Sequence, residues 1–154
     1  MKKVFIVGLG LMGASYALKL KEKNYLVYGF DQDNTVNKKA LDDKIIIDNN
    51  LNKIIEVDLI IMCLYPKDII KFIKAHNNLF NNHQLLTDIS GTKEHLINDL
   101  LKVLPPNIRY LSHHPMAGRE LSGYDNKDIT MFKDANFLIV ETNRHNDNDF
   151  HYVY

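Results

Sequence analysis

The stretch Lys3-Val4-Phe5-Ile6-Val7-Gly8-Leu9-Gly10-Leu11-Met12-Gly13-Ala14-Ser15 is the most informative part of this chain for its fold. A β-branched and aromatic run enters the pattern Gly-x-Gly-x-x-Gly, and an amphipathic helical pattern follows at residues 11–23. Gly8 permits a tight turn off the strand, Gly10 lets the backbone approach a pyrophosphate, and Gly13 lets the helix pack close to the strand. We therefore expect Gly8, Gly10, Leu11, Met12 and Gly13 to hold a dinucleotide at the helix N-terminus.

A second strand-like run, residues 26–31, ends in an acid 18 residues after Gly13. The Asp31 carboxylate can accept hydrogen bonds from both ribose hydroxyls of NAD, and it would repel the 2′-phosphate of NADP. We therefore expect NAD as the cofactor. The alternative is a glycine-rich turn that binds no ligand, with Asp31 solvated.

The rest of the chain alternates apolar runs with helical patterns, which predicts a Rossmann-like α/β fold with a doubly wound, mostly parallel sheet. The expected strands are 3–8, 26–31, 58–64, 84–89, 108–112 and 135–141, with a weak one at 45–48. The expected helices are 11–23, 34–43, 67–76 and 93–104. We expect one dinucleotide-binding domain at 1–142 and a polar tail at 143–154, whose last five residues are too few for another element.

Composition narrows the class of protein. The chain has 154 residues, 45% of them hydrophobic and 25% charged, with a formal net charge of zero. These values suit a soluble domain and give no reason to expect a nucleic-acid or membrane partner. The single cysteine, Cys63, lies within an apolar run, so we expect a buried, inert thiol and a cytoplasmic location.

Unusual residues follow several of the predicted strands. Besides the glycine motif and Asp31, they are Leu64-Tyr65-Pro66, the segment 87–93 and the segment 113–123. Open α/β sheets bind ligands at the carboxyl ends of their parallel strands, so we expect these segments to meet at one site.

The segment Ser112-His113-His114-Pro115-Met116-Ala117-Gly118-Arg119-Glu120-Leu121-Ser122-Gly123 places an imidazole, a guanidinium and a carboxylate within a few residues. Neighbouring residues of a strand point to opposite faces of the sheet, so His113 and His114 cannot both serve the same site. This disfavours a two-histidine metal site, and we expect no metal. His113 is expected to be packed or solvated.

The glycine motif, Thr87-Asp88 with Lys93, and the block His114-Pro-Met-Ala-Gly118-x-Glu120-x-Ser122-Gly123 resemble the prephenate dehydrogenase family, including arogenate dehydrogenases. The resemblance covers residues 1 to about 142. It implies NAD-dependent oxidation of prephenate to 4-hydroxyphenylpyruvate and carbon dioxide, in tyrosine biosynthesis. It also implies that His114 accepts the proton of the ring hydroxyl while a hydride leaves the same carbon.

The substrate of that family is a dianion, so it needs a cation. Arg119 is the local guanidinium suited to a carboxylate, although it could equally pair with Glu120 and hold the loop. Glu120 is either a brace of the loop or a gate over the pocket. Lys93 either contacts substrate or caps and solvates the start of its helix.

The chain departs from the family in two respects. The family has Gly-Ser where this chain has Ser90-Gly91, so the hydroxyl assigned to catalysis has moved by one position. The family also carries a helical C-terminal domain that is expected to be absent here. A homo-oligomer or a separate helical partner would then complete the site. The alternatives are an NAD-binding module without turnover, and a related hydroxyacid or imine reductase.

Overall fold

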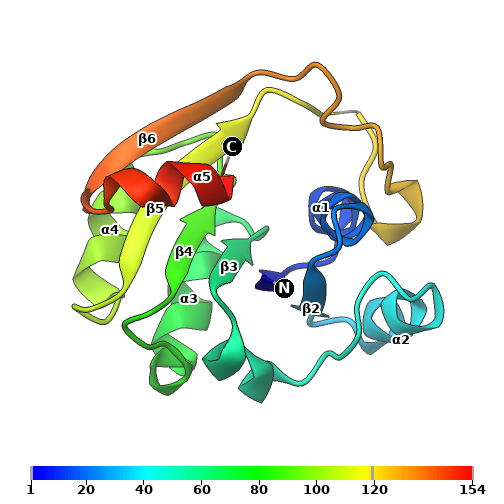
Figure 1. Ribbon diagram of the computed structural model, residues 1–154, viewed down its shortest axis with the longest axis horizontal. Coiled ribbons are helices and arrows are strands. Elements are labelled where there is room, and N and C mark those ends of the chain that lie inside the picture. The colour runs from blue at the N-terminus through cyan, green and yellow to red at the C-terminus, as the bar shows by residue number, and fades with distance from the viewer. Residues whose placement is uncertain (1, 119, 154) are drawn as a thin grey trace.

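A six-stranded sheet with helices on both faces organises the molecule, in a computed structural model that describes residues 2–118 and 120–153 (Figure 1). The strand order is β2-β1-β3-β4-β5-β6. Strands β1 to β5 run parallel, and β6 pairs antiparallel with β5. The predicted Rossmann-like, mostly parallel fold is confirmed. Successive strands are added on opposite sides of β1, which creates the switch point where such sheets bind ligands.

The predicted elements correspond closely to the observed ones. The strands are β1 (Lys3–Val7), β2 (Leu26–Phe30), β3 (Leu59–Met62), β4 (Leu85–Asp88), β5 (Arg109–Pro115) and β6 (Phe137–Arg144). The α-helices are α1 (Leu11–Glu22), α2 (Asn34–Asp42), α3 (Pro66–Ala75), α4 (Glu94–Val103) and α5 (Phe150–Val153). Short 3₁₀ helices form η1 (Leu51–Glu56), η2 (Asn77–Leu79), η3 (Tyr124–Asn126) and η4 (Asp147–Asp149).

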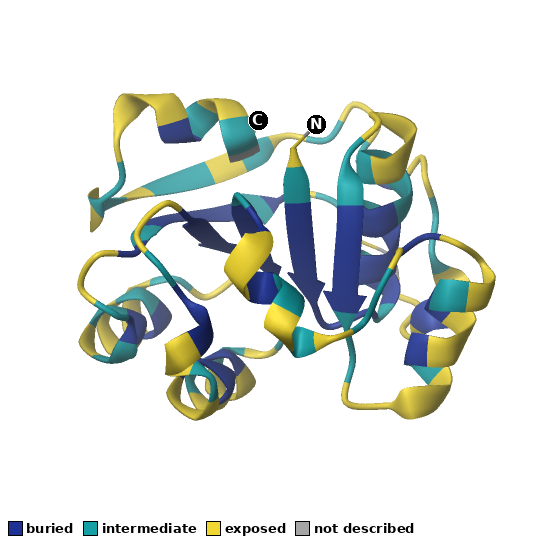
Figure 2. Ribbon diagram, turned by 60° about the horizontal axis from the view of Figure 1, so that its bottom comes forward, coloured by how far each residue is buried: buried dark blue, intermediate teal, exposed yellow. Residues whose placement is uncertain are grey.

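The central strands of the sheet are buried, whereas the edge strand β6 is partly exposed (Figure 2). Two separate hydrophobic clusters cover the two faces. Alternate residues of β1 show the division: Phe5 and Val7 belong to the cluster with α3 and α4, while Val4 and Ile6 belong to the cluster with α1 and α2. All four side chains are at most 1% exposed. A strand buried on both faces should be apolar throughout, as the sequence of β1 is.

The strand register aligns the carboxyl ends of the central strands. Val7 pairs with both Phe30 and Met62, and Met62 pairs with Asp88. The residues that follow these positions are therefore the first residues of neighbouring loops along one edge of the sheet. This row positions the site.

The segment between β5 and β6 leaves the sheet, crosses to α1 and α2, and returns (Figure 1). The backbone N–H of Asp128 donates to Ser15 Oγ of α1 at 3.0 Å. Tyr124 OH donates to Asp43 at the end of α2 at 2.8 Å, and Lys127 forms an ion pair with the same carboxylate. The segment that begins with the His-Pro-Met-Ala-Gly block is thus tied to the glycine-motif half of the domain.

The weak strand predicted at 45–48 is wrong. Ile45 and Ile46 N–H groups both donate to Ala40 O, so this backbone ends α2 instead of entering the sheet. Two backbone hydrogen bonds still join the segment to β2: Ile47 N–H donates to Val27 O at 2.9 Å, and Gly29 N–H donates to Asp48 O at 3.2 Å. The segment lies along the edge of the sheet without forming a strand.

The C-terminal residues are more ordered than the sequence suggests. Strand β6 continues two residues into the predicted tail, and the expectation that the last five residues are too few for another element is wrong, because α5 forms there. Asp149, which is fully buried, accepts hydrogen bonds from Arg109 and from Asn146 N. The guanidinium of Arg144 donates to carbonyl oxygens at the end of α4. Polar residues that suggest a solvated tail are in fact used for capping and ion pairing.

Cys63, which follows β3, is partly buried as a residue, and burial raises the pKa of its thiol, in agreement with the buried, inert thiol that the sequence predicts. No helix in the described part of the chain is long and apolar enough to cross a membrane.

Candidate active site

A cleft of about 1000 Å³ lies at the carboxyl edge of the sheet. Five segments far apart in the sequence line it: the glycine motif, the end of β2, the turn into α3, the loop after β4, and the region from His114 to Gly123. The predicted residues that it brings together are Gly8, Gly10, Leu11, Met12, Gly13, Asp31, Leu64, Tyr65, Pro66, Ser90 and His114. The volume lies at the upper end of the range for ligand sites and suits an extended ligand.

The glycine motif has the geometry that a phosphate-binding turn requires. Gly8 has φ +92°, and a Cβ there would stand 2.6 Å from the carbonyl oxygen of Cys63. A Cβ on Gly13 would stand 1.8 Å from Gly8 O, so only glycine allows α1 to approach the turn. Nothing lies within 4 Å of the place that a Cβ on Gly10 would take. The backbone at Gly10 therefore borders open space next to the first turn of α1, whose free N–H groups favour an anion.

Asp31 is fixed against this turn. Its Oδ2 accepts a hydrogen bond from Leu9 N at 2.8 Å, and its Oδ1 accepts one from Asp33 N at 3.0 Å. An ionised carboxylate has about four acceptor positions, so about two remain for the vicinal hydroxyls of a ribose. The phosphate turn and the acid are joined directly by a hydrogen bond.

The third wall of the cleft comes from the start of α3. Leu64, Tyr65 and Pro66 line it as expected, and Tyr65 is 82% exposed. The sequence reasoning missed four residues further along this helix that also line the cleft: Asp68, Lys71, Phe72 and Ala75. Their spacing places them on one helix face, and that periodicity is the signal that could have identified them.

His114 lies within β5, two residues beyond the predicted end of that strand. Its Nδ1 is 2.9 Å from the carbonyl oxygen of Ile89. Because a carbonyl only accepts, Nδ1 must carry the hydrogen, and a neutral ring then has its free lone pair on Nε2. His114 lines the cleft, so this arrangement leaves a proton acceptor there.

The Ser90-Gly91 pair stands beside this imidazole. A Cβ on Gly91 would lie 3.5 Å from Cε1 and 3.7 Å from Nε2 of His114. Ser90 lines the cleft and is 7% exposed, and its hydroxyl is a buried polar atom with no hydrogen-bond partner among the described residues. The position in contact with the imidazole therefore holds glycine, and the neighbouring hydroxyl is left without a partner.

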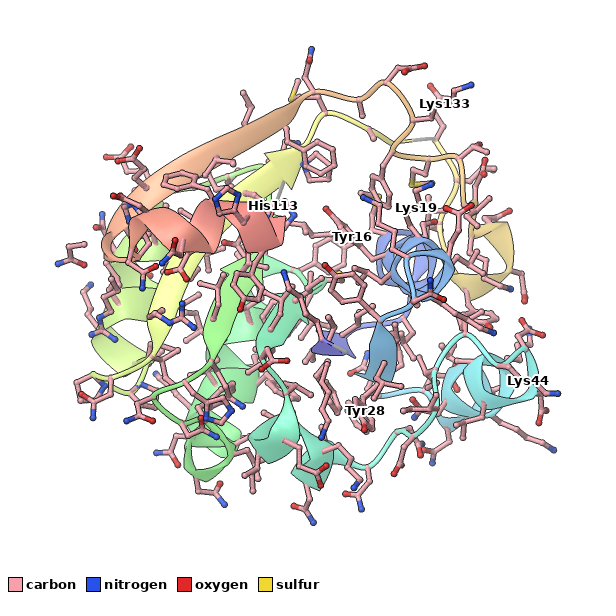
Figure 3. The ribbon with its side chains drawn as sticks, in the orientation of Figure 1. Tyr16, Lys19, Tyr28, Lys44, His113 and Lys133 are labelled. Carbon is pink, nitrogen blue, oxygen red and sulfur yellow. The ribbon has the colours of Figure 1, made fainter. Side chains whose placement is uncertain are left out.

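His113 points to the opposite face of β5 and is packed, one of the two environments predicted for it. Its Nε2 is 2.7 Å from the Tyr16 hydroxyl and its Nδ1 is 2.6 Å from Thr87 Oγ1. Figure 3 labels Tyr16, on α1, and His113, on β5. Burial lowers the pKa of His113 to about 3, so its ring is neutral. It connects the glycine-motif helix to the strand that carries His114.

A buried ion pair supports the same strand. Asp88 is fully buried and accepts hydrogen bonds from Lys93 Nζ at 2.9 Å, Tyr110 OH at 2.7 Å and Ser112 Oγ. Burial alone would raise the pKa of Asp88, but the charge of Lys93 and these hydrogen bonds hold it below its usual value. Lys93 also donates to the carbonyl oxygen of His113 at 2.6 Å. Lys93 therefore braces β5, and it does not line the cleft.

Of the two predicted substrate-binding residues, the structure describes only Glu120. Glu120 is exposed and does not line the cleft, although its neighbours Gly118 and Leu121 do. Arg119 lies outside the described residues. Within those residues, no group of three or more histidine, cysteine, aspartate or glutamate side chains could hold a metal ion.

The chain matches the family model of the prephenate dehydrogenase nucleotide-binding domain over residues 15–154. A prephenate dehydrogenase from Lactococcus lactis subsp. cremoris is 26% identical over 149 residues, which are 92% of this chain and 41% of that protein. The chain thus spans well under half the length of this curated relative.

Two solved structures are similar across nearly the whole chain. Synechocystis arogenate dehydrogenase has a TM-score of 0.90 at 20% identity, over 98% of this chain and 54% of that one. Prephenate dehydrogenase from A. aeolicus, in complex with hydroxyphenyl propionate and NAD+, has a TM-score of 0.87 at 24% identity, over 99% of this chain and 55% of that one. Because both identities are below 25%, these two similarities show the fold alone.

Proposed function

The chain belongs to the prephenate dehydrogenase family, of which it represents the nucleotide-binding domain, and we propose that it serves the NAD-dependent oxidation of prephenate. One observation supports this most directly: the glycine turn and the His114 imidazole line the same cleft. Cofactor and proton acceptor would then meet over one substrate ring.

NAD fits the residues of the cleft. Open space at Gly10 and the first turn of α1 suit a pyrophosphate, and the free acceptor positions of Asp31 suit an adenosine ribose with both hydroxyls. The turn at Leu64, Tyr65 and Pro66 would cover the other side of the dinucleotide. When bound, NAD supplies the hydride acceptor, and the chain supplies orientation and proton transfer.

His114 is the general base of this proposal. Its Nδ1–H is held by Ile89 O, so Nε2 would take the proton from the C4 hydroxyl of prephenate as that carbon is oxidised. The ketone that forms allows the ring carboxylate to leave as carbon dioxide, and the ring becomes aromatic. The driving force lies in the substrate, so the chain mainly has to position it. The unpartnered hydroxyl of Ser90 is a candidate to assist the proton transfer at His114.

Arg119 remains the group proposed to hold the dianion, and Glu120 remains proposed as a brace of the loop or a gate over the pocket. A guanidinium can bind a carboxylate through two parallel hydrogen bonds, which suits the carboxylates of prephenate. The chain covers 41% of its curated relative.

The test is to mix the chain with NAD and prephenate and to follow NADH absorbance, with arogenate and NADP as alternative substrate and cofactor. Turnover with prephenate that is lost in His114→Ala would support the proposal. Turnover with arogenate alone would correct the substrate and retain the chemistry. Failure to bind NADH in a fluorescence titration would refute the assignment.

A second candidate is an NAD-binding module without turnover. NADH binding without prephenate oxidation would distinguish this case. Partial activity would agree with a homo-oligomer or a helical partner that completes the site. The mass of the chain in solution and the effect of adding such a partner would test that, and a cytoplasmic location stays a prediction.

A further inference from the structure

Asn37 is a polar residue that the proposed chemistry does not use, yet it is only 2% exposed. It lies on α2, the helix that follows β2 (Figure 1). Its Oδ1 accepts from Asp31 N at 2.8 Å, and its Nδ2 donates to Asp31 O at 2.7 Å. One side-chain amide therefore pairs with both backbone polar groups of Asp31.

This pairing fixes the plane of the Asp31 backbone and hence the direction of its Cα–Cβ bond. The carboxylate is then held from two further sides, by Leu9 N and by Asp33 N. Asp33 is in turn the N-cap of α2, where its side chain accepts from Thr35 N at 2.8 Å. The acid at the end of β2 is thus oriented by the glycine turn on one side and by α2 on the other.

We propose that Asn37 is a positioning residue that sets the preference between NAD and NADP, acting through Asp31. This inference rests on the proposed dinucleotide site. The preference depends on where the carboxylate stands: it must accept from two ribose hydroxyls, and it must lie where a 2′-phosphate would otherwise sit. A carboxylate that can turn away accepts those hydrogen bonds poorly and leaves the position of the 2′-phosphate open.

The chemistry of asparagine suits this task specifically. An amide presents a donor and an acceptor in one plane, which matches the N–H and C=O of a residue in extended backbone. Leucine has a similar size and offers neither group. Serine offers a single hydroxyl on a shorter side chain, which cannot reach both partners.

The experiment compares the dissociation constants of NADH and NADPH, measured by fluorescence at one salt concentration, for wild type, Asn37→Leu and Asn37→Ser. Asn34→Ala is the matched control, because Asn34 is an exposed asparagine of the same helix. We expect both Asn37 variants to reduce the preference for NADH about tenfold, since a lost hydrogen bond to a well-placed group is worth about that factor. Asn34→Ala should keep the wild-type preference.

A merely structural role would lower stability and leave the preference unchanged, so a double-mutant cycle distinguishes the two. In an Asp31→Asn background, Asn37→Leu should change the preference no further, because its effect passes through the Asp31 carboxylate. The serine variant keeps the test available if the leucine variant does not fold.

Two results would overturn the inference alone: a wild-type preference for NADH that survives both Asn37 substitutions, or effects of Asp31→Asn and Asn37→Leu that simply add. A wild-type chain that binds neither dinucleotide would overturn the proposed function, and the inference with it.

Discussion

The glycines of the first turn allow a matched pair of substitutions with opposite effects, Gly13→Ala and Gly10→Ala. A Cβ on Gly13 would stand 1.8 Å from Gly8 O, whereas real Cβ contacts stay above 3.0 Å. The helix and the turn must therefore separate by at least about 1.2 Å, the difference between those two distances. Both partners are backbone, so neither can move aside by changing rotamer.

This displacement would lift α1 from β1, where the α1 residues Ala14 and Ala17 are fully buried. Overpacking in a core typically costs 1–3 kcal/mol, and a backbone clash should reach at least the upper end, about 3 kcal/mol. For a domain of this size that corresponds to a melting temperature lower by roughly 6–12 °C. Such a loss is a large part of a typical stability of about 5–15 kcal/mol.

Gly10→Ala should leave stability nearly unchanged. Nothing lies within 4 Å of the position that the alanine methyl group would take, and the φ of −67° suits alanine. A small loss of N-cap preference is offset by the reduced freedom of the unfolded chain, so the net change should be about 0.5 kcal/mol or less. NADH affinity should fall tenfold or more, because the methyl group occupies the space through which the pyrophosphate approaches the backbone.

The assays are urea denaturation followed by circular dichroism, and NADH titration followed by fluorescence, on both variants and wild type. An unchanged denaturation midpoint in Gly13→Ala would refute the packing argument. Wild-type NADH affinity in Gly10→Ala would refute the placement of the pyrophosphate.

Three further predictions concern the histidines and the loop beside them. His114→Ala should reduce prephenate oxidation by about 100-fold or more and leave NADH affinity unchanged. If a folded His113→Gln variant loses activity and His114→Ala does not, the base is assigned to the wrong histidine. Burial lowers the pKa of His113 from 6.5 to about 3, so the unfolded chain binds more protons between these values, and the free energy of unfolding should fall as pH decreases through that window. Denaturation at a series of pH values should show a slope that His113→Gln makes shallower; equal slopes would contradict the buried neutral ring. Gly91→Ser should fold normally, because its Cβ would make ordinary contacts with His114 at 3.5 and 3.7 Å, and it should shift the imidazole ¹⁵N NMR signals of His114, which Ser90→Ala should not.

The order and type of the elements follow from the sequence because they depend on local periodicity. The apolar runs of β1 and β3, the helical spacing of α4 and the glycine motif are each readable within a short window. The exceptions also have local causes. The segment 45–48 has strand-forming residues, but its N–H groups are used to end α2, and the polar C-terminal residues cap and pair instead of remaining solvated.

The candidate site divides in the same way. The sequence is enough to predict that the glycine turn, Asp31, Ser90 and His114 lie at one edge of the sheet, because parallel strands bring their carboxyl ends together. Which groups form hydrogen bonds with each other is visible only in the folded molecule: Asn37 bonds to the backbone of Asp31, and His113 to Tyr16. The partners of the second pair are 97 residues apart, and no local pattern encodes such a distance. A buried donor has no water to bond with, so it must bond with a protein acceptor, and the packing of the whole domain determines which acceptor is within reach.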